Sequence, residues 1–126
     1  MKIFTIGHST KPIDEFLDKL VQANVEVVID VRSRPYSSRF PHFNRNSLNY
    51  SLKTVGINYI FKGDSLGGLD ENVDFDKAIG AVYELSKTKR LVLLCSEGDF
   101  RKCHRYNTLT PIFKGMGATV RHLEWK

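Results

Sequence analysis

The sequence predicts an α/β fold, a three-layer sandwich in which helices cover both faces of a mainly parallel sheet of about five strands. Short β-branched runs alternate along the chain with amphipathic stretches at helical spacing. Each such stretch supplies the crossover that two parallel strands need. The 126 residues are enough for one domain, residues 1–126, with a core of its own.

The first third of the chain shows the pattern strand, helix, strand, loop. KIFTI (2–6) is a β-branched run that ends at Gly7. Thr10 is expected to cap the next helix. VEVVIDV (25–31) has the nearly continuous apolar pattern of a buried strand, and residues 32–45 are expected to be irregular. The helix between the two strands carries apolar residues on one face: Ile13, Phe16, Leu17, Leu20 and Val21.

The middle of the chain contains a shorter helix, a third strand and a glycine-bearing loop. Residues 46–55 are expected to form the helix, with Gly56 as its stop signal. INYIFK (57–62) reads as a strand and is followed by GDSLGGLDEN. The glycines of this loop lack the lysine-serine tail of a P-loop, so a flexible turn is expected there.

The last part of the chain repeats the alternation. Asp74 is expected to cap a helix, and RLVLLC (90–95) is the fourth expected strand. In the helix that follows the next loop, Pro111 predicts a kink or a restart. ATVRHLEW (118–125) is the last expected strand. The apolar faces of these two helices are formed by Phe75, Ala78, Ile79, Val82 and Leu85, and by Leu109, Ile112, Phe113 and Met116.

The charge balance favours anionic partners. Nineteen Lys and Arg against 14 Asp and Glu give a formal net charge of +5, which suits an anionic small molecule or nucleic acid. No apolar run approaches the roughly 18 to 20 residues that span a bilayer, so no membrane association is expected. The N-terminal residues do not resemble a secretory signal, so a cytoplasmic location with reduced thiols is expected. Cofactor and oligomeric state are left open by the sequence.

The fold class predicts where a site would lie. In open α/β sheets, ligands bind beyond the carboxyl ends of the strands. The segments that leave those ends are residues 7–10, 32–44, 62–68 and 96–105, and they hold most of the polar residues with chemical potential.

The fourth of these segments follows an apolar strand in LVLLCSEGDFRKCHR. Its candidates for thiol chemistry are Cys95, as nucleophile or sulfur carrier, and Cys103, as resolving thiol. His104 is the candidate acid or base, with Glu97 as a further catalytic candidate and partner of an arginine, and Arg105 suits a carboxylate or phosphate. The alternative is that both thiols are packed and structural. A metal site is not expected, because no C-x-x-C knuckle accompanies these residues.

The segments after the first two strands supply the candidate anion-binding residues. His8 and Ser9 lie in the first strand-to-helix turn, and Asp30 is expected to orient Arg32 by a bidentate pair. Arg34 follows close by. Arginines that alternate with Tyr36, Phe40 and Phe43 also suit stacked bases, so a nucleic-acid or nucleotide binding module built on the loop 32–44 is the alternative to an enzyme.

Four motifs together resemble the domain-of-unknown-function family 488: TIGHST, DVRSRPYSSRFPHFN, LGG and LLCSEGDFRKCHR. The resemblance implies an α/β domain with a polar cluster, and it carries no settled activity. It adds Ser37, Asn44, Gly67 and Gly68 to the candidate binding residues. The matching positions are Gly7, His8, Ser9, Asp30, Arg32, Arg34, Pro35, Ser37, Phe43, Asn44, Gly67, Gly68, Cys95, Glu97, Cys103, His104 and Arg105.

A more distant likeness is to rhodanese-like domains, through VVIDVRSRPY and through RLVLLC with its loop and helix. That likeness implies a persulfide-forming role for Cys95, with loop N–H groups stabilising the sulfur anion. Two functions are therefore compatible with the sequence. One is an enzyme with a Cys, His and Arg anion-binding site that performs sulfur transfer or other thiol chemistry, and the other is the binding module.

Overall fold

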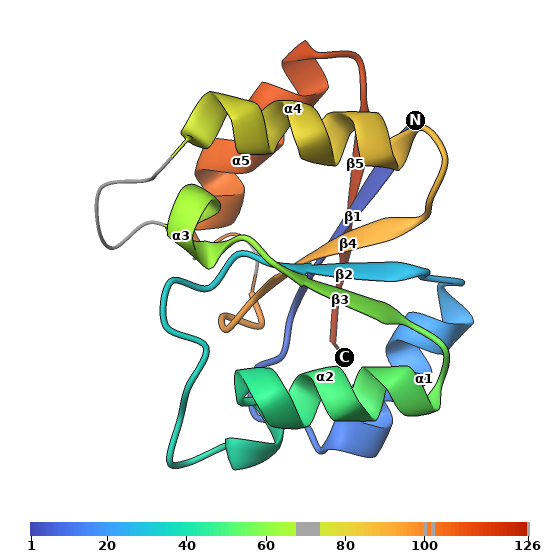
Figure 1. The fold of residues 1–126 in the computed structure, drawn as a ribbon, viewed down its shortest axis with the longest axis vertical. Helices are drawn as coiled ribbons and strands as arrows, with labels where there is room; N and C mark the ends of the chain where they lie inside the picture. The colour runs from blue at the N-terminus through green and yellow to red at the C-terminus, as the bar shows by residue number, and fades with distance from the viewer. Residues whose placement is uncertain (68–73, 100, 102, 126) are drawn as a thin grey trace.

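A computed structural model describes residues 1–67, 74–99, 101 and 103–125, and describes residues 104–106 by their backbone alone. Its strands form one five-stranded sheet in the order β3-β2-β4-β1-β5, and every neighbouring pair is parallel. The predicted α/β class with a parallel sheet is therefore confirmed (Figure 1). The strands are β1 (Lys2–Gly7), β2 (Val27–Asp30), β3 (Asn58–Phe61), β4 (Leu91–Cys95) and β5 (Thr119–Leu123).

The three inner strands explain the continuous apolar runs of the sequence. All residues of β2 and β4 are buried, because these strands are covered on both faces and have a neighbour on each edge. The register pairs Gly7 with Cys95 and Asp30 with Leu94. These pairings bring the carboxyl ends of β1, β2 and β4 to one edge of the sheet.

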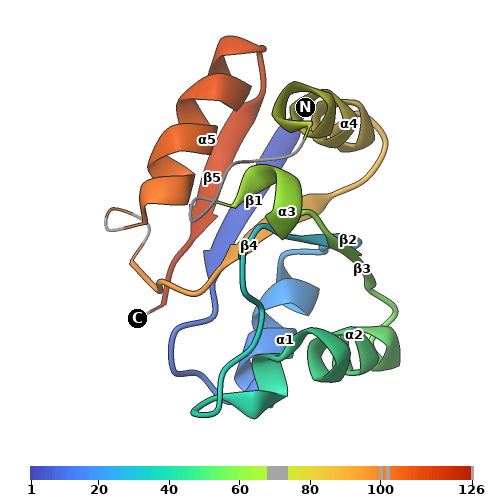
Figure 2. The ribbon, with the colours of Figure 1, turned by 60° about the vertical axis from the view of Figure 1, so that its left-hand side comes forward.

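Helices cover both faces of the sheet, as Figures 1 and 2 show. One face carries two helices and the 3-10 turn η1 (Pro41–Phe43), and the other face carries three helices. The two faces have separate apolar clusters, with Phe16, Leu48 and Val92 in the first and Ile79, Leu93 and Phe113 in the second. The first pair of helices is α1 (Ile13–Gln22) and α2 (Arg45–Thr54), and the second set is α3 (Gly63–Leu66), α4 (Phe75–Ser86) and α5 (His104–Gly115).

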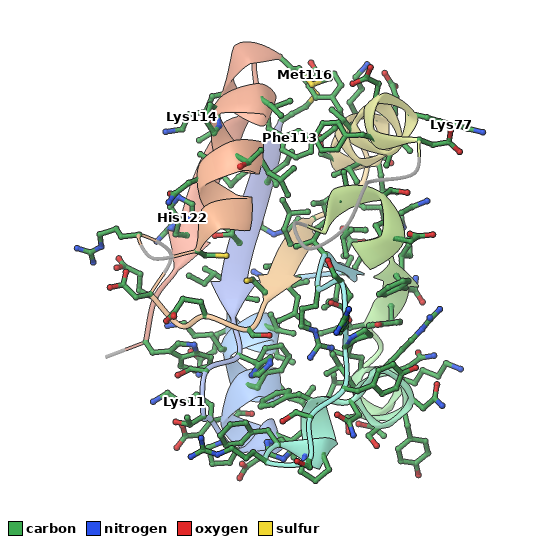
Figure 3. All side chains as sticks on the ribbon, turned by 90° about the vertical axis from the view of Figure 1, so that its left-hand side faces the viewer. Lys11, Lys77, Phe113, Lys114, Met116 and His122 are labelled. Atoms are coloured by element: carbon green, nitrogen blue, oxygen red, sulfur yellow. The ribbon has the colours of Figure 1, made fainter. Side chains whose placement is uncertain are left out.

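Figure 3 shows how side chains fill the space between α4, α5 and the sheet. Phe113 is fully buried there, whereas Lys77 and Lys114 project away from the core. No helix in the described part of the chain combines the length and the apolar character that crossing a bilayer requires.

Two local expectations are wrong, and at Pro111 one of the two expected alternatives is excluded. The N-cap of α1 is Pro12 rather than Thr10, because the helix begins later than the first polar residue suggests. Val21 is 50% exposed, since it lies at the rim of the apolar face. Helix α5 runs unbroken through Pro111, so the expected restart is absent from it.

Two further differences concern the loop after β3 and the helix after it. Residues Gly63–Leu66 form the short helix α3, where a loop was expected. Asp74 occupies the N-cap of α4 as predicted, but its backbone is left-handed, with φ of 52°, and its side chain makes no capping bond. The propensity of Asp for caps identified the position but not the geometry, because Asp also tolerates the left-handed conformation.

The connections leave the sheet in opposite directions at its centre. β1 and β2 lead to α1 and α2 on one face, while β4 leads to α5 on the other face (Figure 1). Where neighbouring strands send their loops to opposite faces, a crevice opens beyond their carboxyl ends. The described residues of those three loops form the candidate site.

Candidate functional site

A cleft of about 410 Å³ lies where the loops after β1, β2 and β4 meet. The β1 loop contributes His8, Ser9 and Thr10, and the β4 loop contributes Ser96, Glu97 and Gly98. The β2 loop contributes more lining residues than either of these loops: Arg32, Arg34, Tyr36, Ser37 and Phe40. The cleft thus coincides with the crevice that the topology produces.

The loops after β1 and β4 are joined by backbone hydrogen bonds. The His8 N–H donates to the Cys95 carbonyl and the Ser9 N–H to the Ser96 carbonyl, each at 3.0 Å. Gly7 makes this approach possible, because a Cβ on it would overlap the Glu97 carbonyl. The ladder between β1 and β4 therefore continues into the wall of the cleft.

His8 is a buried histidine with one ring nitrogen engaged. It is only 5% exposed, its ring stacks on Phe43 with centroids 4.3 Å apart, and its Nδ1 donates to the Ser9 carbonyl at 2.7 Å. Because Nδ1 carries the proton, Nε2 keeps its lone pair, and Nε2 makes no hydrogen bond with the described residues. Burial, assisted by the charge of Arg32, lowers the pKa of His8 to about 4. His8 is thus a neutral imidazole at pH 7.

Asp30 and Arg32 form the predicted bidentate pair, which is confirmed. Nε and Nη2 of Arg32 donate to the two Asp30 oxygens at 2.9 and 2.8 Å, and the Arg32 N–H donates to Oδ1 at 3.1 Å. Arg32 is 4% exposed and Asp30 is 0% exposed. The Tyr59 hydroxyl donates to Asp30 Oδ2 at 2.6 Å, and burial, followed by this bond, raises the pKa of Tyr59. This carboxylate is therefore fully occupied by protein donors.

Arg34 differs from Arg32 in its surroundings. It lines the cleft and is exposed, and its guanidinium makes no hydrogen bond or ion pair with the described residues. Ser37 and Asn44 shape the loop that carries it: the Ser37 N–H donates to Asn44 Oδ1 at 2.6 Å. The Ser37 hydroxyl in turn accepts from the Phe40 N–H at 3.2 Å. Asn44 is thus a loop-shaping residue, and Arg34 is the charged group available to a ligand.

The two cysteines lie close to each other but apart from the cleft. Their Sγ atoms are 2.8 Å apart, and both residues are thiols, 0% and 4% exposed. Cys95 and Cys103 belong to the apolar cluster under α4 and α5, whereas Phe43, which stacks on His8, belongs to the cluster of the opposite face. The structure thus brings the thiols together on one side of the sheet and His8 with Arg32 and Arg34 on the rim of the cleft.

The remaining candidate residues do not share one location. Glu97 lines the cleft, and its carboxylate accepts from the Asp99 N–H at 3.0 Å. Of its two expected arginine partners, Arg105 has its side chain outside the described residues, and Arg101 pairs among the described residues with Asp99 at 3.3 Å and Glu124 at 3.1 Å. Gly67 ends α3, and a Cβ on it would overlap Ser33 Oγ. Gly68 and the side chains of His104 and Arg105 lie outside the described residues.

Two residues that sequence reasoning missed contribute to the site. Tyr59 contacts Asp30 from the neighbouring strand β3, a contact that only the strand order reveals. Trp125, the sole tryptophan, donates from its indole Nε1 to the Gly7 carbonyl at 2.6 Å, beside His8. No spacing pattern links Trp125 to residue 7, because the two are brought together by the pairing of β5 with β1.

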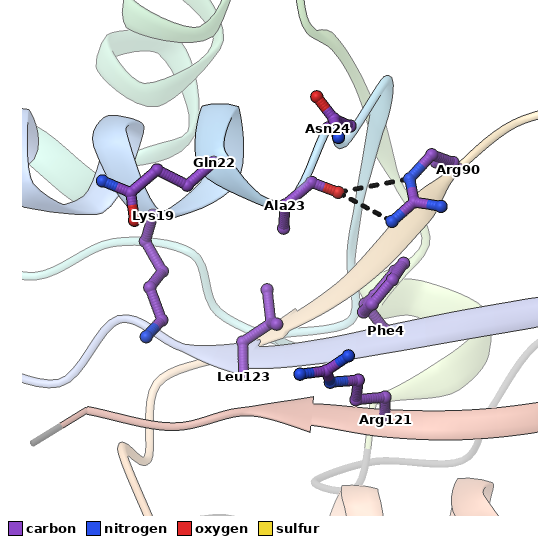
Figure 4. A pocket seen from close by; sticks show the side chains of 8 residues that line it. All are labelled: Phe4, Lys19, Gln22, Ala23, Asn24, Arg90, Arg121 and Leu123. Atoms are coloured by element: carbon purple, nitrogen blue, oxygen red, sulfur yellow. Dashed lines mark hydrogen bonds between the residues drawn. The ribbon is translucent and has the colours of Figure 1, made fainter.

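A second, smaller pocket of about 290 Å³ lies beside α1 and β5 (Figure 4). Its charged lining consists of Lys19, Arg90 and Arg121. Arg90 donates two bonds to the Ala23 carbonyl, at 3.2 and 2.9 Å, and stacks over Phe4. The lining contains cations but no histidine, cysteine or carboxylate, so it offers no acid–base group. Within the described part of the chain, no cluster of three His, Cys, Asp or Glu residues could hold a metal ion.

Comparison with known families gives a match. The family model described as Domain of unknown function DUF488 matches residues 12–75, just over half of the chain. The matched segment contains Asp30, Arg32 and Arg34, and the loops after β1 and β4 lie outside it. No curated protein and no solved structure matches the chain.

Proposed function

The chain belongs to the DUF488 family, and we propose that its cleft is the active site of an enzyme that acts on a small anionic substrate by acid–base catalysis at His8. The observation that carries this proposal is the state of His8. It is a neutral imidazole on the cleft wall, with Nδ1–H held by the Ser9 carbonyl and the Nε2 lone pair uncommitted among the described residues.

The fixed tautomer suits a general base. The Ser9 carbonyl accepts from Nδ1 in the way that the carboxylate of a catalytic triad orients its histidine, and the stacked Phe43 fixes the ring plane. In the empty cleft the pKa of about 4 makes His8 a weak base. An anion in the cleft favours the protonated imidazole, so substrate binding would raise the pKa of His8 toward the working pH. Substrate binding would thus make His8 a stronger base for the reaction.

Arg34 is the proposed anion-binding group. Its guanidinium lines the cleft and has the planar donor geometry that suits phosphate and carboxylate. Arg32 serves as a positioning residue, because Asp30 takes two of its donors in a buried pair. The net charge of +5 adds a general attraction for anions.

The position of the thiols favours His8 over Cys95 as the reacting group. Sulfur transfer at Cys95 requires access for a substrate, and Cys95 is fully buried on the side of the sheet away from His8. The geometry therefore supports acid–base catalysis better than the persulfide chemistry that the rhodanese-like resemblance implies.

The alternative of nucleic-acid binding along the loop 32–44 is supported by one exposed aromatic. Tyr36 is 64% exposed beside Arg34, which suits base stacking. Of the other two aromatics, Phe43 is buried and Phe40 packs against the core. Proteins that bind single strands stack successive bases on several aromatic side chains, whereas this loop exposes one. The enzyme is therefore the preferred function, and the experiment below distinguishes it from the binding module.

The experiment compares Arg34→Ala with Arg39→Ala in binding of sulfate, followed by Trp125 fluorescence. Trp125 suits this purpose because its indole bonds to Gly7, next to His8. Both substitutions remove one cation from the same loop, but Arg39 does not line the cleft. Arg34→Ala should weaken sulfate binding about tenfold or more, whereas Arg39→Ala should change it less than about twofold.

Turnover tests the catalytic part. A panel of small phosphorylated and carboxylated compounds is screened with the wild-type protein, and any compound that turns over is retested with His8→Gln. That variant should lose turnover while it retains sulfate binding. Equal losses of sulfate affinity in the two arginine variants, together with tighter, steeply salt-dependent binding of a single-stranded oligonucleotide, would favour the binding module.

A further inference from the structure

The two cysteines form a compact pair at the ends of one loop. Cys95 Sγ and Cys103 Sγ lie 2.8 Å apart, about 0.8 Å beyond the length of a disulfide bond of about 2.05 Å. Cys95 ends β4, where it is held by the ladder to Gly7, and Cys103 is the N-cap of α5. Because each sulfur is carried at the end of a regular element, the two are held at bonding reach by the fold rather than by the loop between them.

The two thiols differ in environment, which assigns them different roles. Both thiols are buried, but Cys95 is 0% exposed and Cys103 is 4% exposed, so Cys103 is the thiol closer to the surface. Cys103 lies at the N-terminus of a 12-residue helix and within the sequence RKCHR. The helix dipole stabilises a thiolate at such a position.

We infer that Cys95 and Cys103 form a redox-sensitive dithiol that hydroperoxides oxidise to an intramolecular disulfide. The Cys103 thiolate attacks one peroxide oxygen, the O–O bond breaks, and a sulfenic acid and one molecule of water or alcohol are produced. The Cys95 sulfur then attacks the Cys103 sulfur, the S–O bond breaks, and the hydroxyl leaves as water. The two sulfurs lose two electrons and two protons in total, and the peroxide gains them.

The proximity of Cys95 decides the product. A sulfenic acid at Cys103 has a second thiol within 2.8 Å, so condensation to a disulfide competes favourably with further oxidation to sulfinic acid. The resulting bond closes the loop 96–102, and Ser96, Glu97 and Gly98 of that loop line the cleft. Oxidation therefore constrains one wall of the cleft. The inference goes beyond the proposed acid–base activity and does not depend on it.

The test uses the wild-type protein, reduced and then exposed to hydrogen peroxide. After quenching with N-ethylmaleimide in denaturant, mass spectrometry should find a product that has lost two hydrogen atoms, carries no maleimide and yields one peptide pair linked through Cys95 and Cys103. Dithiothreitol should restore two labelled thiols. Two maleimide labels after peroxide, or a protein that gains oxygen atoms without a linked peptide, would overturn the inference.

Single variants test the assignment of roles, and the wild-type result stands without them. In Cys95→Ser, the sulfenic acid should persist on Cys103 and be trapped by dimedone. In Cys103→Ser, Cys95 should stay reduced and accept maleimide only in denaturant, because it is fully buried. Equal trapping by dimedone in the two variants would overturn the assignment of Cys103 as the thiol that reacts first.

Discussion

The Tyr59 hydroxyl donates a hydrogen bond of 2.6 Å to Asp30 Oδ2, the oxygen that also accepts from Arg32 Nη2. Tyr59 reaches Asp30 from β3, which pairs with β2 along its whole length. The bond couples an outer strand to the buried ion pair beneath the cleft. Because the Asp30 carboxylate is fully buried, each of its donors offsets part of the cost of desolvating the charge.

Tyr59→Phe should lower the free energy of unfolding by about 1.5 to 2 kcal/mol. This is the lower part of the range for hydrogen bonds to charged groups, which applies because Tyr59 is only partly buried. Urea denaturation at neutral pH measures the change. Tyr50→Phe is the matched control, since Tyr50 is 74% exposed and makes no bond through its hydroxyl with the described residues. Equal stability losses in the two variants would show that the Asp30 bond contributes nothing.

His8 should make the stability of the protein fall in mild acid. Its pKa is about 4 in the folded protein and about 6.5 when unfolded, so the unfolded chain binds the proton more tightly between these values. The stability associated with neutral His8 is fully present above about pH 6.5 and is lost as the pH falls toward 4. Between pH 7 and pH 5 this one group should cost about 2 kcal/mol.

The measurement compares urea denaturation of the wild-type protein and His8→Gln at these two pH values. Glutamine keeps a polar side chain at the position but does not titrate, so the variant should lose less stability on acidification by about 2 kcal/mol. Carboxylates elsewhere contribute equally to both proteins and cancel in the comparison. The same pH dependence in the two proteins would mean that His8 titrates normally.

The fold was predictable because its signals are local. VEVVIDV and LVLLC are continuous apolar runs, and a strand buried on both faces of a parallel sheet requires such a run. The pairing of Asp30 with Arg32 was predictable for the same reason, since the two residues are two positions apart in the chain at a strand end. The lengths of the elements were less predictable, because their last residues depend on caps and on contacts with other segments.

The arrangement of the candidate site was predictable only in part. The sequence groups Cys95 with His8 at the strand ends, and their strands do pair there. It does not indicate that the thiols pack under α4 and α5 while the His8 ring packs on Phe43, because the side of the sheet that a residue faces at a strand end depends on the local backbone. The contact between Tyr59 and Asp30 depends on the strand order, which the sequence does not specify.

Gly7→Ala should disrupt the cleft wall and destabilise the fold. A Cβ at this position would overlap the Glu97 carbonyl, which is backbone and cannot rotate away, so the β4 loop must shift. We expect a loss of about 3 kcal/mol, the upper end for overpacking, together with weaker sulfate binding because Glu97 and Gly98 line the cleft.

The control for this prediction is Gly80→Ala, in the interior of α4. A Cβ there meets no atom within 4 Å apart from its chain neighbours and the nearby backbone of its own helix, so the substitution should raise the free energy of unfolding by about 0.5 to 1 kcal/mol through helix propensity. The two variants carry the same chemical change, and urea denaturation should therefore give shifts of opposite sign. If Gly7→Ala were as stable as the wild-type protein and bound sulfate equally well, the close approach of the β1 and β4 loops would not hold the cleft together.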